Sequence, residues 1–221
     1  MRKVIILLVT ISLLLHQHAY SQGYYFRHYQ VEDGLSHNTV FCAFQDHKGF
    51  MWFGTKDGLN RYDGNNFKIF RHAENDSMSI GNNFVHQLFE DNKQQLWIGT
   101  ESGMYTYLSA TEKFKQLQTD DSVSAIVSGI AQDSKGIIWF IMEGKLYRYI
   151  SAAPKAERVD ITGNANISSL YISKDDIIWI ATYETLIRYN TTAGTTTAYN
   201  VFNHSPAASS GWIFKIVPRQ R

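Results

Sequence analysis

The chain has 221 residues, a formal charge of +1 and a single cysteine. A near-neutral sequence without basic clusters excludes the electrostatic footprint of a nucleic-acid-binding protein or a polybasic membrane patch. One cysteine, Cys42, excludes an internal disulfide framework, and its apolar surroundings predict a buried thiol rather than a reactive one.

Residues 1–21 are predicted to be a secretory signal peptide. A positive start, Met1–Lys3, precedes an apolar run of about twelve residues, Val4–Leu15, and small residues three apart, Ala19 and Ser21, precede the expected cut. An N-terminal membrane anchor is the alternative, but spanning a bilayer takes about twenty apolar residues. We therefore expect a periplasmic chain, whose charge without Arg2 and Lys3 moves from +1 to about −1.

An internal repeat organises the rest of the chain. Four tryptophans lie 45, 42 and 40 residues apart, and a tyrosine follows each of them by ten residues. An aspartate also precedes each of the first three by six residues. These structural repeat positions are Trp52, Trp97, Trp139 and Trp179, with Tyr62, Tyr107, Tyr149 and Tyr189. We expect each tryptophan to fill the space between neighbouring sheets.

Each repeat is expected to form four short antiparallel strands. In the first, Thr39–Phe44, Phe50–Gly54, Leu59–Tyr62 and Phe67–Phe70 are β-prone and are separated by turn residues. Four strands in some 40 to 45 residues, repeated, are typical of a propeller blade. The aspartates are expected to stabilise turns, and the Gly-Thr pairs after Trp52 and Trp97 to let the backbone turn tightly.

The predicted fold is therefore all-β: a β-propeller of four-stranded antiparallel blades, about four blades plus the start of a fifth, forming an incomplete ring. We interpret the chain as a fragment of a longer protein or of a truncated gene. The expected divisions after the signal peptide are a leading outer strand at 22–33, blades at 34–77, 78–121, 122–163 and 164–206, and the start of a fifth blade at 207–221.

Gly34–Val40, followed by Gln45–Gly64, closely resembles the two-component regulator propeller repeat, and Asp91–Tyr107 matches it nearly as well. The resemblance implies the periplasmic sensor region of a bacterial hybrid two-component sensor histidine kinase, which recognises a carbohydrate, often an oligosaccharide. It implies membrane attachment only through a missing C-terminal part, and it leaves a homodimer of the full-length protein open. No kinase segment is recognised in this sequence, so we expect no enzymatic activity of its own.

Ligand contacts are expected in loops that vary between repeats, since loops at one end of a propeller carry function. These loops precede the first strand or follow the second strand of a blade. The candidate binding residues are His37, Asn38, Lys56, Asp57, Asn82, Asn83, Glu101, Glu143, Tyr183 and Glu184.

No histidine pair has metal-ligand spacing with a supporting acid, so neither a metal nor a cofactor is expected. The leading hypothesis is a ligand-sensing propeller segment with an oligosaccharide as partner. Two alternatives stay open: a secreted propeller glycosidase or lyase acting on polysaccharide, and a propeller scaffold that binds another protein. No catalytic residue is assigned.

Overall fold

The computed structural model describes residues 26–120, 124–151, 153–163 and 165–200. They form four four-stranded antiparallel sheets in which the strands follow one another in chain order. The first two sheets contain β1 (Val40–Gln45), β2 (Met51–Thr55), β3 (Gly58–Tyr62), β4 (Phe67–Phe70), β5 (Val85–Glu90), β6 (Leu96–Thr100), β7 (Gly103–Leu108) and β8 (Lys113–Gln116). The other two contain β9 (Val127–Gln132), β10 (Ile138–Met142), β11 (Lys145–Tyr149), β12 (Glu157–Val159), β13 (Ile167–Ile172), β14 (Ile177–Thr182), β15 (Thr185–Asn190) and β16 (Thr195–Asn200).

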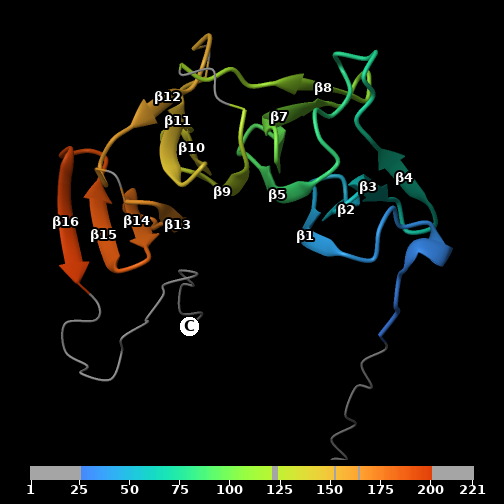
Figure 1. Ribbon diagram of the computed structural model, residues 1–221, viewed down its shortest axis with the longest axis horizontal. Helices are drawn as coiled ribbons and strands as arrows, with labels where there is room; N and C mark the ends of the chain where they lie inside the picture. Colours follow the sequence, from blue (N-terminus) through green and yellow to red (C-terminus); the bar gives the residue numbers. More distant parts are fainter. Residues whose placement is uncertain (1–25, 121–123, 152, 164, 201–221) are drawn as a thin grey trace, which may run out of the picture.

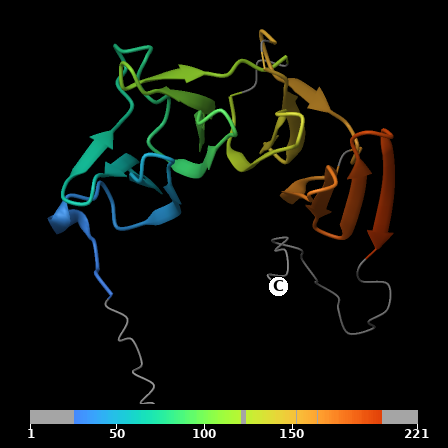
Figure 2. The ribbon, with the colours of Figure 1, turned by 180° about the vertical axis from the view of Figure 1, so that it is seen from behind.

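The four sheets follow one another along an arc (Figure 1), and the view from behind shows the same order (Figure 2). The first strands β1, β5, β9 and β13 lie on the inner side of the arc and contact one another in sequence. The fourth strands β4, β8, β12 and β16 lie on the outer side. This is the blade arrangement of a propeller, which confirms the predicted fold class; closure of a ring is not seen within the described residues.

The four strands predicted in the first repeat are confirmed within one residue at each end. The leading outer strand predicted over 22–33 is wrong for the described part of that range. Residues 26–30 have no regular structure, and Val31–Asp33 form a short 3-10 helix, η1. A strand needs a partner edge, and among the described residues this segment packs on the face of the first blade instead.

The predicted signal peptide at 1–21 and the predicted start of a fifth blade at 207–221 lie outside the described residues. The blade boundaries at 34–77, 78–121, 122–163 and 164–206 stay predictions. In the described part of the chain, no helix is long and apolar enough to cross a membrane.

A repeated aspartate holds the turn between the first and second strands of the first three blades. In the third blade, Asp133 accepts hydrogen bonds from the backbone of Lys135 at 3.1 Å and of Ile137 at 2.9 Å. Its other oxygen accepts from Trp139 Nε1 at 2.9 Å. Asp46 and Asp91 make the same three bonds. The predicted structural role of these aspartates is confirmed, since each one fixes a turn and the tryptophan beside it.

Each of the first three repeat tryptophans packs against a tyrosine of the following blade. Trp52 and Tyr107 pack edge to face with ring centroids 5.0 Å apart. The pairs Trp97–Tyr149 and Trp139–Tyr189 repeat this geometry at 5.6 and 6.1 Å. The three tryptophans are at most 5% exposed. The predicted filling of space between sheets is confirmed for them, and such edge-to-face pairs add stability beyond the burial of area.

The glycine and the threonine that follow Trp52 have separate roles. A Cβ on Gly54 would lie 2.6 Å from the carbonyl oxygen of Val85 and 2.5 Å from Cys42 Sγ, so this glycine permits the next blade to approach closely. The following Thr55 makes the turn: its hydroxyl donates to Gly58 O at 2.9 Å and accepts from Asp57 N at 3.0 Å. The expectation that the glycine serves the turn is therefore wrong.

The first and last blades differ in what covers them. On the first blade, Tyr29 packs against Tyr62 with centroids 5.0 Å apart, where a preceding blade would present its tryptophan. On the last blade, Trp179 stacks on Tyr199 of its own sheet at 6.1 Å. Trp179 is only half-buried, and no described residue of a further blade covers it.

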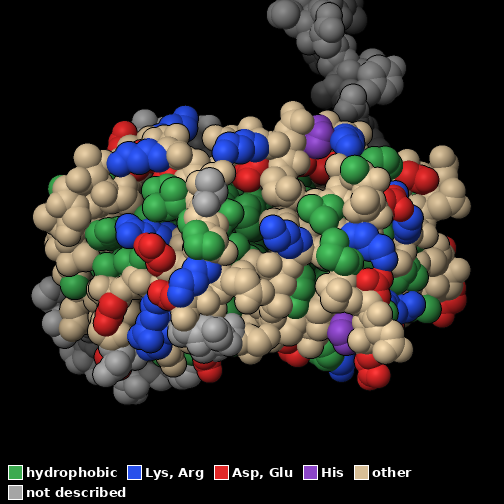
Figure 3. All heavy atoms as spheres, turned by 90° about the horizontal axis from the view of Figure 1, so that it is seen from above, with side chains coloured by type: hydrophobic (Ala, Val, Ile, Leu, Met, Phe, Trp, Pro, Cys, Tyr) green, Lys and Arg blue, Asp and Glu red, His purple; other side chains and the backbone are tan. Residues whose placement is uncertain are grey.

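The outer side of the arc carries interspersed charges. Figure 3 shows Lys and Arg side chains scattered among acidic, polar and apolar groups, without a large area of one sign on this face. Several of the cations are paired along the outer strands, as in Arg148–Glu157 and Lys113–Asp76. This surface therefore offers no continuous electrostatic footprint for a polyanion.

Candidate functional site

The turns that follow the second strands gather at one end of the blades, which we call the loop end. There the backbone N–H of Lys56 donates to Thr39 O at 3.2 Å, just before β1. Glu101 donates to Phe84 O at 3.2 Å, and Glu143 to Ile126 O at 3.0 Å, in the same way. The fold thus holds two kinds of predicted loop together, the one before the first strand and the one after the second strand. Both lie next to the start of the innermost strand.

A β-bulge interrupts the innermost strand of every blade at the loop end. Val40 pairs with Thr55 and Cys42 with Gly54, so Phe41 is left out of the ladder. His86, Ser128 and Ser168 are the skipped residues of the other three blades. A bulge re-aims a side chain and is common next to binding sites. The fold therefore places one side chain per blade at the same bulged position of the innermost strand, and the residue type at this position differs between blades.

Aromatic rings of the first two blades meet at these bulges. The Phe41 and His86 rings lie 4.6 Å apart, and Phe84 lies 6.5 Å from each of them. Phe41 is 42% exposed, which is unusual for a large apolar side chain on an inner strand. Lys56 Nζ lies 5.8 Å from the Phe84 ring, and Glu101 Oε1 lies 3.4 Å from His86 Nε2. We call these five residues the ring cluster.

The structure brings six of the predicted binding residues to this cluster or its border. Lys56 and Glu101 belong to the cluster itself. Asn82 Oδ1 accepts from Phe84 N at 2.7 Å. Asp57 pairs with Arg71 at 2.9 Å and accepts from Asn83 Nδ2 at 3.2 Å, which fixes the neighbouring turns. His37 accepts from Thr39 N at 2.8 Å, on the side next to Lys56.

The other four predicted residues lie apart from the cluster. Asn38 accepts a bond from Val31 N at 2.9 Å and so anchors the leading segment. Glu143 occupies the corresponding turn of the third blade, whereas Tyr183 and Glu184 occupy that of the fourth. Glu184 bonds within its own turn, and Tyr183 is 44% exposed.

Sequence reasoning missed Phe41, Phe84 and His86. The available signal was the position eleven residues before each tryptophan, which reads Phe, His, Ser and Ser, directly after a position that is Val or Ile in every repeat. Aromatic residues in an apolar run are ordinarily interpreted as core, and the bulge that lifts Phe41 out of the ladder leaves no mark in the sequence pattern.

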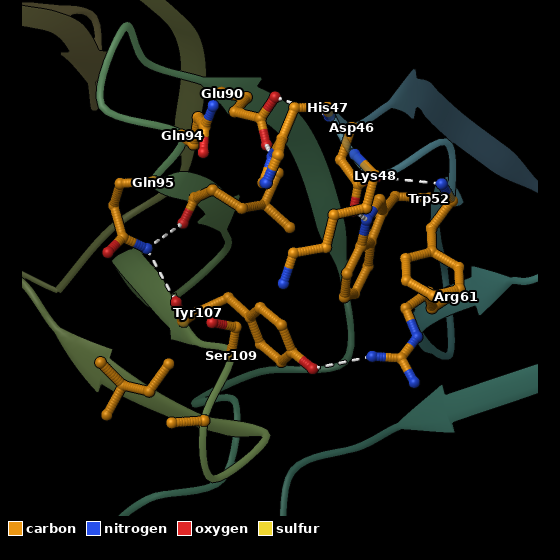
Figure 4. A pocket seen from close by; sticks show the side chains of 14 residues that line it. Asp46, His47, Lys48, Trp52, Arg61, Glu90, Gln94, Gln95, Tyr107 and Ser109 are labelled. Carbon is orange, nitrogen blue, oxygen red and sulfur yellow. Dashed lines mark hydrogen bonds and ion pairs between the residues drawn. The ribbon is translucent and has the colours of Figure 1, made fainter.

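A cavity of about 330 Å³ opens between the first two blades at the opposite end, which we call the turn end. The β1–β2 turn, with His47 and Lys48, forms one side, and Gln95 and Ser109 of the second blade form the other. Figure 4 shows the Lys48 side chain extending from its turn into the cavity, toward Tyr107. No predicted binding residue lines this cavity.

Arg61 forms the floor of the cavity with the rings around it. Its guanidinium lies 4.8 Å from the centroid of the Phe50 ring and donates to the Tyr107 hydroxyl at 3.0 Å. It also bonds Glu112 at 2.9 Å, and Glu112 in turn pairs with Lys68. Burial raises the pKa of Tyr107, although the nearby Arg61 charge opposes this shift, so the phenol keeps its proton at neutral pH.

Among the described residues, neither end of the blades contains a candidate metal site or a reactive thiol. Across the described residues, no group of three or more His, Cys, Asp or Glu side chains could hold a metal ion. The Cys42 side chain is only partly buried by exposed area, yet desolvation raises the pKa of its thiol to about 12, so the thiol stays protonated at neutral pH.

The sheets, their order and their inner bulges define a segment of a β-propeller with four blades. The first two blades carry the two-component regulator propeller repeat, matched at residues 34–57 and 79–102. This confirms the resemblance that the sequence indicated.

One relative of this chain and two proteins of similar structure are named as components of two-component signalling. The chain is 44% identical over 62 residues to histidine kinase P4 of Formosa agariphila, a stretch that covers 28% of this chain and 4% of the kinase. The fold also matches extracellular domains of two hybrid two-component systems from B. thetaiotaomicron. One has a TM-score of 0.51 at 22% identity, covering 79% of this chain and 32% of that domain. The other has 0.54 at 16%, covering 81% and 35%.

The blade arrangement is shared with a protein of another class. Virginiamycin B lyase from Staphylococcus aureus matches with a TM-score of 0.60 at 17% identity, over 76% of this chain and 57% of the lyase. Identities this low show the fold alone. The chain spans about a third of the extracellular domains and a small part of the kinase that it matches.

Proposed function

We propose that this chain is part of the extracytoplasmic sensor of a hybrid two-component system and that its loop end binds an oligosaccharide. The repeat in the first two blades and the relatives in two-component signalling support the sensor role. The periplasmic location and the signal peptide belong to the same proposal.

The observation that carries the ligand class is the ring cluster. Sugars present apolar ring faces, which stack on aromatic side chains, and hydroxyl groups, which need hydrogen-bonding partners. Phe41 and His86 provide exposed or half-exposed rings on adjacent blades, and Lys56 and Glu101 border them with a cation and a carboxylate. Concave sites that combine apolar surface with a few polar groups are typical of small-molecule binding.

Binding to the folded chain is expected to raise its melting temperature, because a ligand that binds only the native state stabilises it. The experiment screens a panel of neutral and acidic oligosaccharides by thermal shift, with the wild-type chain and a Phe41→Ala variant. We expect at least one glycan to raise the melting temperature of the wild type and to lose most of this effect in the variant.

The matched control is Ile69→Ala, which also removes a partly exposed apolar side chain but lies on the outer strand β4. The glycan effect should survive in this control. A panel without any thermal shift, or a shift that Phe41→Ala leaves intact, would contradict the proposed site.

A further inference from the structure

The turn-end cavity between the first two blades is not a general product of the repeat. Beside the corresponding turn, between the second and third blades, the space is only about 30 Å³, and a separate cavity of about 220 Å³ at that interface is lined by Thr106, Tyr149 and Pro154. There Lys93 Nζ donates to Ser151 Oγ at 3.1 Å and bridges the two blades. Lys48 and Ser109 occupy the same repeat positions at the first interface, yet within the described residues the Lys48 ammonium makes no hydrogen bond or ion pair. Among the described residues, the Lys48 ammonium is therefore without a partner at the first interface, whereas Lys93 bridges the blades at the second.

The carboxylates beside this ammonium are already occupied by donors of the protein. Asp46 accepts from two backbone N–H groups and from Trp52 Nε1 at 2.8 Å. Glu90 accepts from the backbone of His47 at 3.0 Å and from its Nδ1 at 2.7 Å. Both acids are therefore engaged in holding the cavity walls in place. The Lys48 ammonium, which extends into the cavity, remains available to a ligand.

A second donor lies on the floor. The Tyr107 hydroxyl accepts a bond from Arg61, so its own proton is available to an acceptor in the cavity. The Tyr107 and Trp52 rings supply apolar surface beneath it. A volume of about 330 Å³ is at the small end of the range for ligand pockets and suits a single ring rather than a chain of rings.

We propose that this cavity is a binding site for a small carboxylate carried on a ring, with the carboxylate bonded by Lys48 and Tyr107 and the ring laid against the aromatic floor. The ammonium, the phenol proton and the flat apolar surface match the two parts of such a molecule. The site lies at the opposite end of the blades from the ring cluster. It would bind its ligand whether or not the loop end binds an oligosaccharide.

The experiment titrates the ¹⁵N-labelled chain with sodium benzoate and sodium glucuronate, and with benzyl alcohol and glucose as their neutral counterparts. The indole N–H signal of Trp52 reports on the cavity, and that of Trp97, at the interface that Lys93 bridges, is the internal control. We expect saturable shifts of the Trp52 signal with at least one carboxylate, little response to its neutral counterpart and an unmoved Trp97 signal.

Lys48→Ala should weaken carboxylate binding by about tenfold or more, the effect of losing a charge-assisted hydrogen bond. Lys93→Ala, at the same position of the next repeat, should leave it unchanged. Inorganic phosphate tests whether charge alone suffices, and it should bind more weakly than the ring carboxylate. An unmoved Trp52 signal, equal binding of the neutral compound or of phosphate, or equal losses in the two lysine variants would each overturn the proposal.

Discussion

The first and fourth blades present the same pair of rings in the same geometry, yet they bury it to different extents. Trp52 stacks on Phe70 with centroids 5.9 Å apart and planes at 22°, and Trp179 stacks on Tyr199 at 6.1 Å and 28°. Phe70 is 9% exposed, whereas Tyr199 is 44% exposed. The stack is therefore a property of the single blade, and its burial is supplied by the neighbour.

This comparison predicts different energetic roles for repeated tryptophans. The largest expected contrast is between Trp139→Ala and Trp179→Ala. Trp139 is 1% exposed between two blades, so its removal should lower the free energy of unfolding by about 3–5 kcal/mol. Trp179→Ala should cost less than Trp139→Ala, because Trp179 is only partly buried among the described residues. Urea unfolding of the two variants measures both values, and equal losses would show that the fourth tryptophan is covered after all.

The aspartate turn offers a second contrast. Asp133→Ala should lower the free energy of unfolding by about 2–4 kcal/mol, since three donors lose an ionised acceptor and the Trp139 indole is buried. Ser173 stands at the same position of the fourth blade, and within the described part of the chain its hydroxyl accepts only one bond, from Ile177 N at 3.3 Å. Ser173→Ala should therefore cost less than about 1 kcal/mol by the same measurement. A Ser173 effect as large as that of Asp133 would contradict the hydrogen-bond account.

An aspartate at position 173 should give the turn of the fourth blade the hydrogen bonds that the aspartates of the other three blades accept. The turn backbone already suits it, because Asp176 has a φ of 56° where Gly136 has 80°. We expect Ser173→Asp to raise the free energy of unfolding by about 0.5–1 kcal/mol through new bonds to the turn. Equilibrium unfolding checks the gain, and Lys174→Gln, one position along, controls for the same change of one unit in net charge.

Thiol labelling provides the most local comparison. Burial raises the pKa of Cys42 to about 12, so at pH 8 its thiol should react with a thiol reagent only after unfolding. Because the folded pKa lies above the unfolded value of about 8.5, this group leaves stability unchanged below pH 8 and lowers it as pH rises from about 9 toward 12. Unfolding curves between pH 7 and 10.5 should show the decline, and Cys42→Ser should reduce it.

The repeat positions made most of the fold predictable. Trp52 and the residues around it recur at fixed offsets, and a constant offset translates directly into a constant place in a blade. The leading segment failed because its conformation depends on what it packs against: Tyr29 meets Tyr62 on the face of a sheet and does not extend an edge. Gly54 was misjudged for a similar reason, because the clash that excludes a side chain comes from Val85, which is distant in sequence.

The candidate site was less predictable than the fold. The choice of loops placed Lys56 and Glu101 at the ring cluster, since loop positions follow from the strand pattern. The rings themselves were hidden by the bulge at Phe41, which depends on pairing between strands. The turn-end cavity could not be foreseen at all, because Lys48 and Lys93 have the same place in the repeat and differ only in whether a serine lies within reach.

The Trp–Tyr contact has a direction, because each blade gives its tryptophan to the next blade and receives that contact on its own tyrosine. Coupling in the array is thus between nearest neighbours, as in a one-dimensional lattice. Such a lattice loses order from its ends before its middle. Amide hydrogen exchange should therefore be slowest in β6 and β10 and fastest in β16, and a ligand that bridges Phe41 and His86 would slow exchange most in the first two blades.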